Sequence, residues 1–397
     1  MSDKDRKEIK SKLKLNALGH SYNDMYFFII PFLLPLFREE FSLSYVQSGL
    51  ILTIHVALRS IFSLVFGYFG DKYEKRVIIA CGFVCSSIFL GSLIWINNIY
   101  FIVTFLFLLA IGVSTFHPLA TAMVRENSKK HQRGRYISLF SAAGTAGIIV
   151  ASILFGFLVQ TWGWKITCLL LSLPGYFLGY AYLKSKKDKK NLKTEAEKKI
   201  KQGYVYLFFM SMGIRSLGLW AILSFLPLYA TDYLGLKPEI SAWSVSIIFI
   251  GMLVGSLISS RIIDKSNPLI LVLSATIITT FLILCITFIA QPIPIILLIG
   301  TLGTVEGIFF PSQSTWLTFI CPVNHQSKIF GIGLFVEGVS ATIAPTLYGW
   351  IADQFSLILA YRLAAIPLSV SFILFLILHF LETKHDKAYK VKLSLSI

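Results

Sequence analysis

Residues 67–76 read Gly-Tyr-Phe-Gly-Asp-Lys-Tyr-Glu-Lys-Arg and stand at the junction of two long apolar runs. The runs cover residues 46–69 and 77–96, and each is close to the roughly 20 residues that a helix needs to cross the hydrocarbon core of a bilayer. Because charged side chains are costly inside that core, the charged residues from Asp71 onward predict a turn at the membrane surface. The stretch therefore indicates two membrane-spanning helices joined by a short loop.

Apolar runs of this kind recur along the whole chain. Of its 397 residues 55% are hydrophobic and only 14% are charged, whereas about a quarter of the residues in soluble domains are charged. This composition excludes an ordinary soluble domain and predicts an all-α membrane protein. Twelve membrane-spanning helices are expected near residues 13–37, 46–69, 77–96, 99–123, 136–160, 164–183, 203–229, 241–262, 268–290, 293–317, 328–350 and 358–381.

One connection between these helices differs from the others. Residues 184–202 are long, polar and strongly basic, which is typical of a solvated cytoplasmic linker that also touches anionic lipid head groups. The linker divides the chain into an N-terminal six-helix bundle, residues 1–183, and a C-terminal six-helix bundle, residues 203–397.

The two bundles share an internal repeat. A shift of 193 residues places Asp71-Lys72 on Asp264-Lys265, and Phe116-His117-Pro118 on Phe309-Phe310-Pro311. Transporters built from duplicated halves bind their cargo near the bilayer midplane, between the repeats. We therefore expect two pseudo-symmetric bundles with a site between them.

Asp71 and Gly67 lie four residues apart and so share one face of a helix. The glycine lets another helix approach, and the carboxylate can accept hydrogen bonds from the N–H groups that begin a neighbouring helix. These features predict a cytoplasmic gate that holds an outward-facing arrangement. The residues assigned to it are Gly67, Asp71, Lys72, Lys75, Arg76 and Asp264.

The net charge of +16 comes from 36 basic and 20 acidic residues. In a soluble protein this excess would suggest nucleic acid, but here most basic residues fall in the two termini and in alternate loops. Such an asymmetry is the positive-inside signature, which orients a protein in its membrane. It predicts a multi-pass protein of the inner or plasma membrane with both termini in the cytoplasm, and no nucleic-acid partner.

Five ionisable residues are expected near the middle of the membrane: Asp24, Arg59, Arg215, Glu306 and Glu337. Each would cost about 2.5–3.5 kcal/mol or more if it faced lipid, so these side chains should face a cavity or one another. None has an ionisable mate under the 193-residue shift. The scaffold is duplicated and the charges are not, which favours a specialised central site.

The predicted roles of these residues follow from their chemistry. Guanidinium groups suit anionic substrates, and a desolvated carboxylate beside a histidine can accept a proton. The residues assigned to proton coupling are Asp24, Glu306, Glu337 and His20. The residues assigned to substrate binding are Arg59, Arg215, His55 and His117. Ion pairing that only holds the bundles together, and simple packing of His117, are the alternatives.

A metal site is not expected, because His20 and Asp24 share a helix face but need more ligands. No cofactor is predicted, and a proton gradient is the expected source of energy. The expected partners are a small-molecule substrate, protons and the lipid bilayer, with the protein acting as a monomer.

The stretch 67–76 resembles the motif G-x-x-x-D-[RK]-x-G-[RK]-[RK] of the major facilitator superfamily, with Glu74 in place of the motif's glycine. The resemblance covers almost the whole chain. It implies the major facilitator fold and secondary active transport by alternating access.

Three short segments resemble the fosmidomycin-resistance group of drug:proton antiporters. They are Gly19-His20 with Asp24, Phe116-His117-Pro118, and Arg215-Ser216 followed by residues 225–229. This resemblance implies proton-driven export of a small toxic compound, and the function we expect is proton-coupled efflux of a small organic compound that is anionic or drug-like. The antiporter motif G-x-x-x-G-P is incomplete, because Gly147 is followed by Ala151-Ser152. Uptake or exchange of an organic anion is therefore an alternative, and a membrane-embedded acyltransferase is a remote one.

Overall fold

The computed structural model describes residues 3–43, 45–187, 202–229, 238–289, 291–320 and 325–394. Within these ranges the chain is helical, without strands. The α-helices are α1 (Asp3–Phe41), α2 (Tyr45–Lys72), α3 (Lys75–Ser92), α4 (Ile99–Ser114), α5 (Phe116–Glu126), α6 (Arg133–Lys184), α7 (Gln202–Leu228), α8 (Pro238–Ile262), α9 (Pro268–Ile286), α10 (Pro292–Ile320), α11 (Gln326–Gln354) and α12 (Leu357–Ser394). Short 3-10 helices are η1 (Leu93–Trp95), η2 (Lys130–Gln132) and η4 (Ile263–Lys265).

Ten helical segments of the described chain are long and apolar enough to cross a membrane. One of them is α6, whose 52 residues would measure about 78 Å as a straight helix, more than twice the roughly 30 Å hydrocarbon core. It crosses twice and bends at Gly163, where φ is 74° and ψ is 167°, a backbone conformation that glycine adopts readily. With α1 these segments make the twelve predicted spans.

The fourth span is broken into α4 and α5 at Thr115. The break lies three residues before Pro118, which has no N–H group to donate to the carbonyl of Ser114 four residues earlier. The hydroxyl of Ser63 on α2 donates to that carbonyl instead, at 3.4 Å. His117 lies in the first turn of α5, directly after the break.

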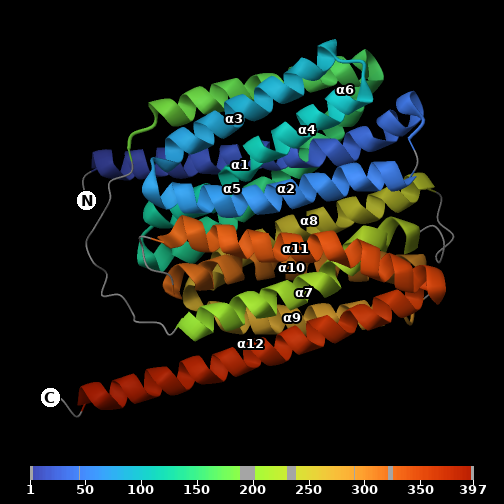
Figure 1. The fold of residues 1–397 in the computed structure, drawn as a ribbon. Coiled ribbons are helices and arrows are strands. Elements are labelled where there is room, and N and C mark those ends of the chain that lie inside the picture. Colours follow the sequence, from blue (N-terminus) through green and yellow to red (C-terminus); the bar gives the residue numbers. More distant parts are fainter. Residues whose placement is uncertain are drawn as a thin grey trace.

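The helices form two bundles (Figure 1), with α1–α6 in one and α7–α12 in the other. Each bundle has its own core of buried apolar side chains. Helices α2 and α11 lie side by side where the bundles meet, and both ends of the chain lie at the same end of the molecule (Figure 1). We call this end the terminal end. Most of the predicted linker 184–202 lies outside the described residues.

Candidate functional site

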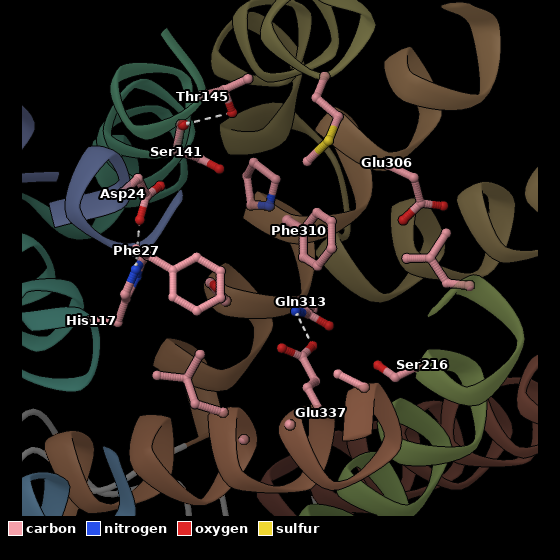
Figure 2. Close-up of a pocket in the computed structure, with 18 of the residues that line it drawn as sticks. Asp24, Phe27, His117, Ser141, Thr145, Ser216, Glu306, Phe310, Gln313 and Glu337 are labelled. Carbon is pink, nitrogen blue, oxygen red and sulfur yellow. Dashed lines mark hydrogen bonds and ion pairs between the residues drawn. The ribbon is translucent and has the colours of Figure 1, made fainter. Parts of the chain in front are cut away.

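A cavity of about 420 Å³ lies between the two bundles. Helices α1, α2, α5 and α6 line it from one side, and α7, α8, α10 and α11 from the other. Its wall is mostly apolar and includes the rings of Phe27, Phe28, Trp220, Phe249 and Phe310. Polar groups are few and come from both bundles, as Figure 2 shows for Asp24 and His117 on one side and Gln313 and Glu337 on the other.

The polar group on the N-terminal side is a cluster of His20, Asp24 and His117, which we call the His–Asp–His cluster. Nε2 of His117 donates to Oδ1 of Asp24 at 2.9 Å, and Nε2 of His20 lies 3.2 Å from Oδ2 of the same carboxylate. Both oxygens of Asp24 therefore face an imidazole nitrogen.

The orientation of His20 is set by its other ring nitrogen. Nδ1 lies 2.6 Å from the backbone carbonyl oxygen of Phe140, and because a carbonyl only accepts, Nδ1 is the donor. The ring also stacks on that of Phe140, with centroids 4.0 Å apart. Nε2 of His20 is thereby directed at Asp24.

Gly144 on α6 makes room for this cluster. A Cβ atom at this position would lie 2.6 Å from Oδ2 of Asp24 and 2.6 Å from Nε2 of His20. Any larger side chain would push the carboxylate and the imidazole away from α6. The cluster therefore depends on a glycine that the motif analysis did not single out.

Arg59 on α2 supplies the positive charge that lines the cavity. Its guanidinium lies over the ring of Phe27, 4.0 Å from the centroid. No carboxylate of the described residues lies within salt-bridge distance of it. The ring holds the guanidinium in place without neutralising it.

Glu337 on α11 faces the cavity from the C-terminal bundle. One of its oxygens accepts a hydrogen bond from Nε2 of Gln313 on α10, at 2.8 Å, as drawn in Figure 2. Its second oxygen has no hydrogen-bond partner among the described residues. This carboxylate is therefore held by an amide and not by a counter-ion.

Arg215 and Glu306 form a buried ion pair inside the C-terminal bundle, with Nη2 of Arg215 2.5 Å from Oε1 of Glu306. Thr279 donates to the same oxygen at 2.7 Å, and the guanidinium lies 3.4 Å from the centroid of the Phe309 ring. Glu306 reaches the edge of the cavity, whereas Arg215 does not line it and is only 1% exposed. The structure thus places Arg215 in the bundle core, away from the position expected of a substrate ligand.

His55 also lies away from the cavity. Its side chain is fully buried, stacks on the ring of Phe27 with ring centroids 5.1 Å apart, and does not line the cavity. It contacts the ring on which the guanidinium of Arg59 rests. Of the four residues assigned to substrate binding, the structure brings Arg59 and His117 to the cavity.

The predicted gate residues lie at the terminal end. Oδ1 and Oδ2 of Asp71 accept hydrogen bonds from the N–H groups of Ser327 and Lys328, both at 3.0 Å, in the first turn of α11. Oδ2 of Asp264 accepts from the N–H of Arg135, at 3.2 Å, in the first turn of α6. Each carboxylate crosses from one bundle to the other.

Gly67 allows a close approach of α2 and α11 at this end. A Cβ atom there would lie 2.6 Å from the carbonyl oxygen of Ser327 and 3.1 Å from Cα of Gly331. Deeper in the same contact region, the hydroxyls of Ser138 and Ser259 are 3.0 Å apart across the two bundles. The bundles are therefore in direct contact between the cavity and the terminal end.

The basic gate residues bind within their own bundle in the part of the chain that the structure describes. Lys72 donates to the hydroxyl of Tyr68, Lys75 pairs with Glu126 at 2.8 Å, and Arg76 donates to the carbonyl of Leu183 at 2.6 Å.

Glu74, which departs from the family motif, pairs with Arg76 at 3.0 Å and with Lys187 at 2.6 Å. Hydrogen bonds from these two cations hold its pKa below the ordinary value. These contacts connect the turn between α2 and α3 with the C-terminal end of α6 and the residues that follow it.

Gln313 and Gly144 are site residues that the sequence analysis missed. Gln313 is uncharged, so a search for ionisable residues within spans passes over it. Gly144 is related to Glu337 by the 193-residue shift, and that relationship could have indicated that both helices face the centre.

Comparison with known proteins identifies the fold. The model of the Major Facilitator Superfamily matches residues 17–213 and 208–394. The cis,cis-muconate transport protein of Acinetobacter baylyi is 23% identical over 82% of this chain and 83% of that protein. The proton-coupled antiporter flippase LtaA of Staphylococcus saprophyticus is 22% identical over 85% of this chain and 89% of that protein.

Among solved structures, the transporter FucP in its outward conformation superposes with a TM-score of 0.76 at 16% identity, over 94% of this chain and 99% of FucP. These proteins are transporters, so the comparisons do not support the alternative of a membrane-embedded acyltransferase. The family model spans both bundles, and the helices, the repeat and the central cavity agree with it. The chain belongs to the Major Facilitator Superfamily and is a multi-pass membrane transporter, not an enzyme.

Proposed function

We propose that the protein carries a small organic anion across the membrane together with protons, by alternating access. The observation that carries this proposal is the guanidinium of Arg59, which faces the cavity beside Phe27 without a carboxylate within salt-bridge distance among the described residues. A charged group at membrane depth is costly unless it is paired. An anionic group of the cargo would complete this pair, and the planar guanidinium suits a carboxylate or phosphate.

The cavity also suggests what the rest of the cargo looks like. Its volume of about 420 Å³ lies within the usual range of small-molecule pockets, and aromatic rings form much of its wall. A compact anion with an apolar body satisfies both features. The relationship to a muconate transport protein supports an organic anion as cargo.

We place the coupling proton at Glu337. Glu306 is paired with Arg215, and both oxygens of Asp24 already face histidines, whereas among the described residues Glu337 is bonded only to the amide of Gln313. An anionic cargo adds negative charge beside Asp24 and Glu337 in a low-dielectric cavity. A proton on Glu337 would relieve that repulsion, so cargo and proton should bind together.

The contacts at the terminal end support an outward-facing state. Asp71 and Asp264 join the bundles there, and the distribution of basic residues predicts that this end is cytoplasmic. The cavity would then open to the opposite side of the plasma membrane. The likeness to FucP in its outward conformation is consistent with this state.

Transport by purified protein in liposomes tests the proposal, with labelled muconate and a panel of small carboxylates and phosphonates as probes. Wild-type protein should accumulate at least one anion under an imposed pH gradient. Arg59→Gln should lower this uptake at least about tenfold, because the anion loses a charged partner, and Arg59→Lys should restore part of it. Arg261→Gln, on an exposed arginine at the end of α8, is the matched control and should transport normally.

Equal transport by wild type and Arg59→Gln would overturn the assignment of Arg59. Direction is measured separately in membrane vesicles of defined orientation. Accumulation into the cell would agree with joint binding of cargo and proton, whereas accumulation out of the cell would contradict joint binding and favour the antiport that the fosmidomycin-resistance resemblance implies.

A further inference from the structure

We propose that the His–Asp–His cluster binds one divalent transition-metal ion of the Zn²⁺ type at the wall of the central cavity. The sequence alone offers two ligands, His20 and Asp24, on one helix face. The fold brings a third, His117, from a different helix. The three donor atoms lie within 4.8 Å of one another.

The distances are close to those of a coordination site. Zn²⁺ binds imidazole nitrogen and carboxylate oxygen at about 2.0–2.2 Å, so donors arranged tetrahedrally around one ion are about 3.4 Å apart. The two histidine-to-carboxylate distances are 3.2 Å to Oδ2 and 2.9 Å to Oδ1 of Asp24, and all three donor atoms lie within 4.8 Å of one another. Side-chain rotations that bring both imidazole nitrogens towards one carboxylate oxygen would complete the ligand set.

The second nitrogen of His20 is held as it is in metal-binding histidines. Such histidines usually donate their other ring N–H to a carboxylate or a backbone carbonyl, which sets the tautomer and directs the free lone pair at the ion. Nδ1 of His20 donates to the carbonyl of Phe140 at 2.6 Å. The lone pair of Nε2 is thereby directed at Asp24 before any ion is present.

The surroundings leave one coordination position open. All three ligands line the cavity, so the fourth position would face its interior, and the glycine at position 144 lets the backbone of α6 lie directly against Asp24 and His20. Three protein ligands with a fourth position open to a ligand are typical of exchangeable and catalytic zinc sites, whereas structural sites use four. An oxygen atom of water or of a bound anion would fill the fourth position here.

The charges around the cluster favour an anion as the fourth ligand of this ion. Two neutral imidazoles and the carboxylate of Asp24 would reduce the charge of a divalent ion to one. Arg59 adds a second positive charge facing the cavity, and Glu337 faces it from the opposite bundle. That the cargo's anionic group fills the open position rests on the proposed function, but binding of the ion itself does not.

Titration of metal-free, tag-free protein in detergent tests the site. Calorimetry with Zn²⁺ and visible absorption with Co²⁺ should each show one equivalent bound. A background with Cys81→Ser removes a thiol that is exposed in the described part of the chain. His20→Gln, Asp24→Asn and His117→Gln should each weaken binding at least about tenfold, since even outer partners of metal ligands contribute that much.

Control variants distinguish the loss of a metal ligand from the loss of the folded structure. His131→Gln, on an exposed histidine, should bind as wild type does. His117→Cys, which keeps a zinc ligand, should retain binding, and Gly144→Ala should weaken it although all three ligands remain. Each variant is first checked for a single size-exclusion peak.

Absence of a bound equivalent in the wild type would overturn the proposal, as would binding that survives the double change His20→Gln and His117→Gln. Zinc-edge absorption spectra should report nitrogen and oxygen ligands without sulfur. If metal binding fails while Arg59-dependent anion transport persists, only the metal site is wrong. If metal binds but no anion is transported, only the proposed function is wrong.

Discussion

Asp71 and Asp264, which the 193-residue shift superposes, make equivalent bonds to opposite bundles. Asp71 accepts from the N–H of Lys328 at the start of α11, and Asp264 accepts from the N–H of Arg135 at the start of α6. Arg135 and Lys328 are themselves related by the same shift. The duplicated scaffold therefore carries two copies of one contact, and together they hold the bundles at the terminal end.

Asp71→Asn is expected to loosen this end. The substitution keeps the shape but removes the negative charge that the N-terminus of α11 favours, and hydrogen bonds to a charged acceptor are worth about 1.5–3 kcal/mol. In the Asp71→Asn variant, a single cysteine introduced in place of the buried Ser138 should react with a membrane-impermeant maleimide about tenfold faster than the same cysteine does in protein that keeps Asp71. Lys72→Gln, which changes the neighbouring exposed residue, should leave the rate unaltered. An unchanged rate in Asp71→Asn would show that its bonds do not hold this end closed.

Gly67→Ala should have the same effect for a steric reason. An added Cβ would lie 2.6 Å from the carbonyl oxygen of Ser327, so α2 and α11 would have to separate. Gly156→Ala is the control, because a Cβ there meets nothing within 4 Å. Alanine favours helix by about 1 kcal/mol over glycine, so the control should be neutral or stabilising in a thermal unfolding assay, and Gly67→Ala should increase maleimide labelling at Ser138→Cys.

The Arg215–Glu306 pair is expected to stabilise the C-terminal bundle. Removing one partner of a buried pair leaves a charge without compensation and costs about 3–5 kcal/mol, whereas replacing both by apolar residues is often tolerated. Arg215→Met alone should lower the unfolding temperature in detergent strongly, and Arg215→Met with Glu306→Leu should recover most of the loss. A double variant as unstable as the two single changes added together would contradict this role.

Glu337→Gln should separate cargo movement from the proton gradient. Glutamine can still bond to Gln313 but cannot release a proton. Uptake against a gradient should fall at least about tenfold, while exchange of labelled for unlabelled anion across the liposome membrane continues. Glu306→Gln, tested in parallel, should affect stability more than coupling. If Glu337→Gln still accumulates the anion under a pH gradient, the coupling proton lies elsewhere.

Much of the fold could be predicted from the sequence because it rests on local properties. Span length and apolar composition determine that a segment crosses the bilayer, and the repeat relates the two halves. The bend at Gly163 within α6 and the break before Pro118 are also local, since each follows from the backbone chemistry of one residue. These features needed no knowledge of contacts between distant segments.

The site could be predicted only in part. The cost of burying charge indicates that Asp24, Arg59, Arg215, Glu306 and Glu337 face protein and not lipid, but it does not say which of them face one another. Arg215 and Glu306 are 91 residues apart in the chain, and only the tertiary structure shows that their side chains meet at 2.5 Å and neutralise each other. The tertiary structure likewise shows that Arg59 faces the cavity.

By itself, the sequence determined the number of membrane crossings, the duplicated frame and the set of charges buried in it, because each depends on composition along a single helix. Only the tertiary structure decided which charges pair, which remain at the cavity, that His117 joins His20 and Asp24, and that Gly144 packs against this cluster. Those outcomes depend on how helices distant in the chain pack, and packing distances are not encoded in the periodicity of any one segment.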